Sequence, residues 1–271
     1  MNKTRWALAV VLAAFFLPAR AAAQGDVSDL VTDRPDFTES SAVVGRGMLQ
    51  VEMGSTFESE GASDARTRTF TAPLGLVRLG IARSLELRLS GAGDIISSYG
   101  QGLGSVSVSG GSDLEIGMKW VFLDHEDKGF AMAVIPMLSL PVGSVAMSSS
   151  TYDPTVKLTW AKTLSRGFDL SGNFNVSRPT DVDGRYTEQA YSASLAHALS
   201  TNWGGYWEVY GFVPLGRADG QAWTANTGVT RSIGSSAQVD VEVGRGVTAA
   251  APDWFVGVGV GIRTSALRRS H

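Results

Sequence analysis

From residue 45 onward, hydrophobic and polar residues alternate along the chain. The clearest example is 113–120, where every second residue is apolar and the residues between are charged or glycine. Comparable alternation occurs at 49–57, 77–81, 85–89, 156–160, 168–176, 191–199, 207–213, 223–229, 239–243 and 256–262. Segment 130–142 is apolar on both phases, and helical spacing is found only near the N-terminus. The pattern predicts an all-β fold, because side chains of a strand point alternately to its two faces.

The connections between these segments alternate in length. Short connections are expected near 82–84, 124–129, 164–167, 200–204 and 232–236, and longer ones near 59–67, 95–111, 143–151, 179–186, 216–221 and 247–253. Short turns on one rim and long loops on the other are typical of outer-membrane barrels. We therefore predict a closed antiparallel transmembrane β-barrel of about 12 strands, with both termini on the short-turn, periplasmic side.

Charged residues within the strands keep to the phase opposite the apolar one. A charge that faced lipid at mid-membrane would cost about 2–4 kcal/mol, so we expect this phase to line the lumen. The same charges would face water in a soluble barrel, and that alternative stays open here. The lumen-lining candidates are Glu52, Arg78, Glu86, Arg88, Asp113, Glu115, Lys119, Lys157, Asp169, Glu208, Asp240, Glu242 and Arg263.

Aromatic residues gather at the expected strand ends. Those beside short turns are Trp120, Phe122, Phe130, Trp160, Phe168 and Trp203, and those after long loops are Trp223 and Trp254. Rings at two levels match the girdles at the two membrane–water interfaces. Aromatic core residues of a soluble β-protein are the alternative interpretation.

The N-terminus has the pattern of a secretory signal peptide. Lys3 and Arg5 precede an apolar run at 6–17, and small residues at 21–23 precede Gln24. A helix that crosses a bilayer needs about 20 apolar residues, so this run is short for an anchor. We expect cleavage after Ala23 and export to the outer membrane of a Gram-negative bacterium.

These observations divide the chain into four parts. We expect a signal peptide at 1–23, an N-terminal periplasmic segment at 24–44 that forms a possible plug, an outer-membrane β-barrel at 45–263 and a C-terminal tail at 264–271. Barrels of this kind commonly end on an aromatic residue that the assembly machinery reads, and here the tail ends on His271 instead. The expected partners are outer-membrane lipids, the barrel-assembly machinery and an unidentified small-molecule solute.

Composition narrows the chemistry. The chain has no cysteine, 3 histidines and a formal net charge of −3, so it lacks the basic surface that nucleic acid requires. We expect no cofactor, no metal site and no catalytic residue. One enzymatic alternative remains, an outer-membrane lipid hydrolase that would use His197, which falls on the apolar phase. No serine lies two residues from His197 to complete such a pair.

The stretch from Thr32 to Ser40, TDRPDFTES, resembles the opening of an outer-membrane transporter family named for the meta-pathway of phenol degradation. Looser matches follow in the expected order at 85–88, 139–143, 208–211, 253–255 and 262–263. The resemblance implies an outer-membrane barrel that transports small, often apolar compounds. It does not identify phenol as the solute.

The charged segment before the first strand suggests a gate. We expect Asp33, Arg34, Asp36 and Glu39 to fold back and pair with inward charges such as Arg78, Arg88 or Lys119. A loose periplasmic leader is the alternative, because termini are commonly disordered. The expected function is passage of small, possibly hydrophobic or aromatic, solutes. A non-conducting barrel with a structural or surface-interaction role is the second hypothesis, and the lipid hydrolase is the third.

Overall fold

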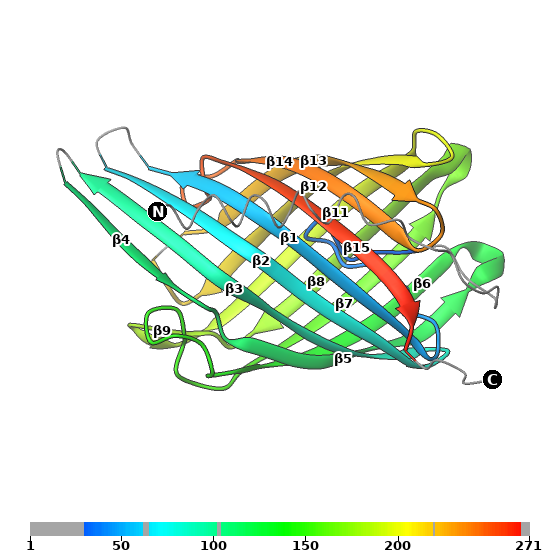
Figure 1. Ribbon diagram of the computed structural model, residues 1–271, viewed down its shortest axis with the longest axis horizontal. Coiled ribbons are helices and arrows are strands. Elements are labelled where there is room, and N and C mark those ends of the chain that lie inside the picture. The colour runs from blue at the N-terminus through cyan, green and yellow to red at the C-terminus, as the bar shows by residue number, and fades with distance from the viewer. Residues whose placement is uncertain (1–29, 62–64, 102–103, 219, 267–271) are drawn as a thin grey trace, which may run out of the picture.

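The computed structural model describes residues 30–61, 65–101, 104–218 and 220–266. Within them one antiparallel sheet rolls into a barrel (Figure 1). The sheet has 13 strands, of which β4 pairs with the far end of β3, so 12 close the barrel. The prediction of an all-β closed barrel is confirmed. The expected signal peptide at 1–23 lies outside the described residues, as does most of the expected C-terminal tail.

The strands follow each other around the barrel in sequence order. They are β1 (Met48–Glu60), β2 (Ala65–Ala82), β3 (Leu85–Gln101), β4 (Gly104–Gly110), β5 (Leu114–His125), β6 (Phe130–Leu140), β7 (Asp153–Thr163), β8 (Phe168–Ser177), β9 (Thr180–Asp181), β10 (Gly184–Arg185), β11 (Thr187–Ala198), β12 (Trp203–Leu215), β13 (Ala222–Ile233), β14 (Ala237–Gly246) and β15 (Trp254–Ser265). The short strands β9 and β10 form a hairpin of their own within a loop.

The barrel closes where its first and last strands meet. Strand β1 pairs with β15 from Met48 opposite Ser265 to Ser59 opposite Trp254, and on its other side β1 pairs with β2. Closure satisfies the backbone hydrogen-bonding groups of every wall strand, which a sheet edge in lipid could not do. The first and last strands thus leave no open edge in the barrel wall.

Short and long connections lie at opposite ends, as the sequence predicts. Arg83 and Ser84 join β2 to β3, and single-turn 3₁₀ helices join β5 to β6 (η2, Glu126–Lys128) and β7 to β8 (η3, Ser165–Gly167). We call this the short-turn end and the opposite one the long-loop end. Among the described residues, no helix is long and apolar enough to cross a bilayer.

One expected long loop is instead a regular hairpin. The sequence suggests a loop near 95–111, but β3 continues to Gln101 and pairs with β4 over Ile95 to Gln101 (upper left in Figure 1). Serine and valine alternate in β4, and this β-compatible pattern extends the ladder beyond the barrel wall. In this region the connection is therefore an extension of the sheet.

The two faces of the wall have opposite chemistry. In β3, Glu86 is 0% exposed and its neighbour Leu87 is 43% exposed. Large apolar side chains point outward all around the barrel, and the buried side chains are mostly polar or charged. Strand β6 differs, because Ile135 and Met137 also point inward and are buried. Apolar residues thus face the lipid side and polar ones the interior.

Reversing this polarity on the outer face should destabilise the protein. Val241 lies at the middle of β14 and is 55% exposed. We expect Val241→Arg to lower the free energy of unfolding in lipid vesicles by about 2–4 kcal/mol, since the charge would face the bilayer midplane. Urea titrations of the refolded protein measure this. The matched control is Val247→Arg, in a long loop and 66% exposed. An equal decrease in the free energy of unfolding for Val241→Arg and Val247→Arg would contradict the assignment of the outer face.

Candidate functional site

Residues 30–47, which we call the lumen segment, lie inside the barrel (dark blue in Figure 1). The carbonyl of Val31 accepts hydrogen bonds from Gln50 and Arg78. At the other end of the segment, the Val44 N–H donates to Glu86 at 2.7 Å, and the Gly47 N–H donates to the Gly80 carbonyl. The segment therefore enters the lumen and returns to the short-turn end, where β1 begins.

Asp33 contacts several bases on one side of the lumen. Its carboxylate lies 2.6 Å from the Arg88 guanidinium, 2.8 Å from the Lys119 ammonium and 3.4 Å from Arg78. Together with Lys157 on β7, these three bases form what we call the basic wall, on β2, β3, β5 and β7. Burying a charge is tolerated when it is paired and hydrogen-bonded, and Asp33 meets both conditions.

Glu39 anchors the same wall further along the segment. Its carboxylate pairs with Arg88 at 3.0 Å and with Lys157 at 2.5 Å. Its backbone carbonyl accepts a hydrogen bond from the Thr159 hydroxyl at 2.6 Å. Arg88 thus bridges Asp33 and Glu39, and the segment's two acidic anchors share one guanidinium.

Two acidic side chains of the wall itself complete this network. The Arg78 guanidinium lies 2.8 Å from Glu86 and 3.1 Å from Glu52, and all three side chains are buried. The Glu52 carboxylate also accepts the Asp33 backbone N–H at 2.9 Å. Charges that alternation places on one phase of separate strands are thus brought into direct contact by the pairing of the neighbouring strands β1, β2 and β3.

Arg34 points the opposite way, into a slot between two glycines. Gly54 on β1 pairs in register with Gly259 on β15, and a Cβ added to either residue would collide with the Arg34 guanidinium. In this slot Arg34 lies 3.5 Å from Asp240 and 3.9 Å from Glu242. The alternating glycines of β15 therefore make room for the lumen segment.

The far tip of the segment contacts β12. Glu208 accepts the backbone N–H groups of Phe37 at 2.9 Å and Thr38 at 2.7 Å, and also the Thr38 hydroxyl at 2.5 Å. The Phe37 ring stacks on Tyr210, with ring centroids 4.7 Å apart, and meets Phe212 edge-on at 5.3 Å. We call the side chains of Glu208, Asp240 and Glu242 the acidic wall.

Four of these contact residues are absent from the sequence-based candidates. Phe37 and Thr38 lie in a segment without periodicity, so no pattern marks them. Tyr210 and Phe212 share the phase of Glu208 and could have been found by extending that phase along β12. The girdle interpretation places aromatic residues on the outer face, so it does not predict these two inward rings.

The predicted candidates occupy different environments. Buried ones are Glu52, Arg78, Glu86, Arg88, Lys119, Glu208, Asp240, Glu242 and Arg263. Glu115, Lys157 and Asp113 are half-buried, and Asp169 is exposed near the short-turn end. Of the four gate candidates, Asp33 and Glu39 contact bases, Arg34 contacts acids, and Asp36 lies near Glu208.

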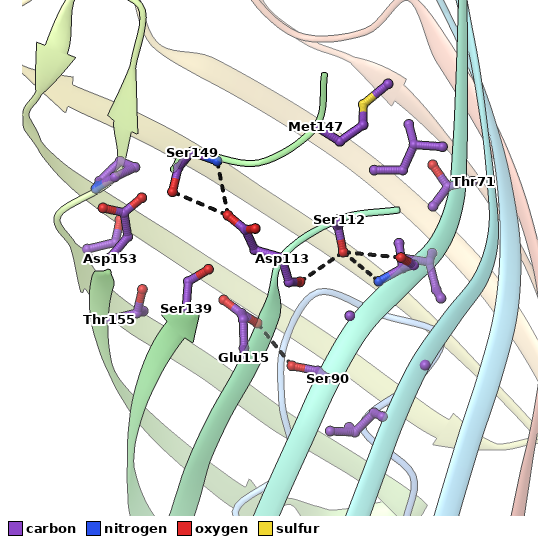
Figure 2. A pocket seen from close by; sticks show the side chains of 18 of the residues that line it. Thr71, Ser90, Ser112, Asp113, Glu115, Ser139, Met147, Ser149, Asp153 and Thr155 are labelled. Atoms are coloured by element: carbon purple, nitrogen blue, oxygen red, sulfur yellow. Dashed lines mark hydrogen bonds between the residues drawn. The ribbon is translucent and has the colours of Figure 1, made fainter. Parts of the chain in front are cut away.

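A cavity of about 640 Å³ lies between the lumen segment and the long loops (Figure 2). Arg34 and Glu52 line it on one side, and Asp113 and Ser149 line it at the loop end. Asp113 accepts the backbone N–H groups of Gly143 at 2.9 Å and Ser149 at 3.0 Å, which ties the β6–β7 loop to the wall. The lumen is therefore partly open toward the long loops.

The long loops are tied together by a second, exposed set of charges. Arg217 pairs with Asp181 and lies over the ring of Tyr186, 4.1 Å from the centroid. The hydrogen bond from Arg217 lowers the pKa of the Asp181 carboxyl below its ordinary value. Arg185 pairs with Asp153 at 3.0 Å. These contacts lie at the long-loop end, where Asp153 is the first residue of β7.

The glycine slot gives a direct test of how the lumen segment is held. We expect Gly259→Val to displace Arg34, because the new side chain would occupy the volume of its guanidinium. Overpacking of this kind costs about 1–3 kcal/mol, which should raise the population of released segment about tenfold. The chain has no cysteine, so Ser41→Cys supplies a single buried thiol whose labelling rate reports release.

The control for this test is Gly75→Val on β2, where an added Cβ would meet only an ordinary contact of 3.6 Å. Labelling of the Ser41→Cys thiol should stay slow in that background. Equal labelling rates with Gly259→Val and with Gly75→Val would show that the slot does not hold the segment.

Comparisons with known proteins give a family and a fold. Residues 32–264 match the model of the family described as "Putative MetA-pathway of phenol degradation". No curated protein sequence matches the chain. Similar solved structures include an outer membrane channel from Pseudomonas putida F1, with a TM-score of 0.61 at 12% identity over 83% of this chain and 98% of that one.

Two porins are also similar in fold. The NanC porin has a TM-score of 0.51 at 8% identity, and the KdgM porin has 0.51 at 11%. Each match covers 79% of this chain and 98% of the porin. The fold matches bacterial outer-membrane barrels, as predicted. Because the family model spans nearly all of the barrel and the inward-folded TDRPDFTES stretch, this chain belongs to the family of the MetA-pathway of phenol degradation.

Proposed function

We propose that this protein is a gated outer-membrane channel for small solutes and that the lumen segment is its gate. The observation that carries the proposal is the way the segment is held. Asp33 and Glu39 bind the basic wall and Arg34 lies against the acidic wall, through ion pairs that can exchange for water. The family and the fold, which resembles those of a channel and two porins, support the same function.

Ion pairs suit a reversible gate. Taking charges out of water costs several kcal/mol per ion, about as much as their mutual attraction returns in a low dielectric. Releasing the segment rehydrates the carboxylates of Asp33 and Glu39 and the bases they contact. Both states can therefore lie close in free energy, whereas a large apolar interface would favour the closed state strongly.

The orientation follows from the loops. Outer-membrane barrels place short turns in the periplasm, so the segment would enter from the periplasmic side and the cavity would face the exterior. The cavity wall combines polar side chains with apolar ones such as Leu74, Ile95 and Met147. This mixed lining is compatible with small solutes that are partly hydrophobic or aromatic.

A non-conducting barrel is the second candidate, and the network at Arg78, Arg88 and Lys119 favours it. These buried charges would seal a permanently closed lumen as well as they hold a gate. A lipid hydrolase has less support. In the described part of the chain, His197 stacks on Phe168 at 4.2 Å and its Nδ1 lies 3.0 Å from the Gly167 carbonyl, with no hydroxyl or carboxylate partner.

The conductance of the Asp33→Asn variant distinguishes two hypotheses, that the lumen segment is a gate and that it closes the lumen permanently. The substitution leaves Arg88, Lys119 and Arg78 without their shared carboxylate, and breaking a buried pair costs about 3–5 kcal/mol. The open state should then gain at least about a hundredfold in relative population. We expect frequent conducting steps for Asp33→Asn in a planar bilayer and rare ones for the wild-type protein.

The matched control is Asp181→Asn, which removes an exposed ion pair in the long loops. Its conductance should equal that of the wild-type protein. If Asp33→Asn inserts as a folded barrel and conducts no more often than the wild type, the lumen segment is not a gate and the structural role is favoured.

Charge reversal at Glu115 tests whether the cavity lies on the conducting path. Glu115 lines the cavity and is held by a 3.0 Å hydrogen bond from the Ser90 hydroxyl. We expect Glu115→Lys, made in the Asp33→Asn background, to shift reversal potentials in a salt gradient toward anion selectivity, because fixed charge selects mobile counter-ions. Unchanged reversal potentials would place the path elsewhere.

A further inference from the structure

Phe37 binds the barrel wall in the manner of a ligand. Its ring lies almost parallel to Tyr210, at an interplanar angle of 14°, and its edge contact with Phe212 has an angle of 79°. All three rings are half-buried, so they can be reached from the lumen. We call the rings of Tyr210 and Phe212 the aromatic ledge.

A carboxylate lies directly beside this ledge. Glu208, Tyr210 and Phe212 occupy one face of β12, since residues two apart in a strand point the same way. The Phe37 N–H donates to one oxygen of Glu208, and Thr38 donates to the other. The wall therefore recognises an aromatic ring and hydrogen-bond donors at the same time.

The part of Phe37 that meets the wall has a simple chemical equivalent. The ring stacks on Tyr210, the backbone nitrogen donates to Glu208, and Cβ and Cα link the two. A ring joined through two carbons to a nitrogen donor is the skeleton of 2-phenylethylamine. An arylalkylamine could make the same contacts, with an ammonium group in place of the backbone N–H.

The charge of this region favours a cation over a neutral solute. Arg34 is the base that faces Asp240 and Glu242, and it belongs to the lumen segment. If the segment leaves, Glu208 loses its three donors and the other two carboxylates lose their guanidinium. Buried or partly buried carboxylates without partners are costly, so this wall would then attract a positively charged donor.

We propose that the aromatic ledge and Glu208 form a binding site for arylalkylamine solutes and that Phe37 occupies it as a competitor within the chain. The inference rests on the proposed function in one respect, because solute and Phe37 can exchange only if the segment leaves the wall. A bound amine holds the segment away from β12 and so favours the open channel.

The test is calorimetric titration of the refolded full-length protein with 2-phenylethylamine. Removing the competitor in Phe37→Ala should tighten binding about threefold to tenfold, the value of one aromatic pair. Glu208→Gln, which keeps the shape of the side chain, should weaken binding about tenfold or more through loss of charge-assisted hydrogen bonds. Phe57→Ala is the matched control, because that ring contacts Trp254 rather than the lumen segment.

Two related compounds separate the contributions of ring and charge. We expect 2-cyclohexylethylamine, which has the same nitrogen but no aromatic face, to bind at least threefold more weakly than 2-phenylethylamine. We expect 3-phenylpropanoate, with the ring but a negative charge, to give no saturable heat. Equal affinity of the two amines, or equal affinity of wild type and Phe37→Ala, would overturn the proposal.

The experiments distinguish a wrong proposal about the amine site from a wrong proposal about the channel. Saturable amine binding that tightens in Phe37→Ala supports the site even if bilayers containing Asp33→Asn stay silent. A different result would contradict the amine site but support the channel. In that case Asp33→Asn would conduct, while the affinity for 2-phenylethylamine would be the same in Phe37→Ala, Glu208→Gln and the wild type. Heat-dependent electrophoretic mobility of each variant verifies that its barrel is folded.

Discussion

Ionised side chains buried inside this barrel must be paired, and that requirement explains most of the interior. The wall balances its charges only in part: Glu52 and Glu86 pair with Arg78, but Lys119 and Lys157 pair with the lumen segment. The other inward carboxylates, Glu208, Asp240 and Glu242, lie across the lumen. A segment of mixed charge supplies what each side lacks. Asp33 and Glu39 compensate the basic wall, and Arg34 compensates the acidic one.

Space for this segment comes from residues without side chains. Glycine occupies three successive inward positions of β15, at Gly257, Gly259 and Gly261, and an added Cβ at Gly261 would lie 2.6 Å from Thr32. In a soluble protein such a run would weaken the core, because glycine buries no apolar surface. Here the apolar surface faces outward toward lipid. Inward positions can therefore lack a side chain without loss of hydrophobic stabilisation.

Alternation predicts the phases and inward charges of the wall strands other than β6, which is apolar on both phases, because it reports which face each residue occupies. It does not reveal which charges meet. Glu39 and Lys157 are 118 residues apart, and their contact depends on closure of the sheet and on how an aperiodic segment folds. Alternation does not predict the β3–β4 extension for a different reason, because the serine-rich sequence of β4 resembles a loop in composition.

The arrangement of charge across the lumen has a consequence for any solute that passes through. Release of the lumen segment in the proposed gate would expose the basic wall and the acidic wall, so the open path would attract both signs of charge on separate surfaces. In that state a solute with a single charge would be drawn to one wall, where it would replace the segment residue that compensates that wall when the segment is bound. Asp33 and Arg34 are adjacent in sequence but directed to opposite walls, so in the proposed gate anions and cations would compete with the closed state through different contacts. The same residues that neutralise the closed lumen thus define which chemical groups can compete for it.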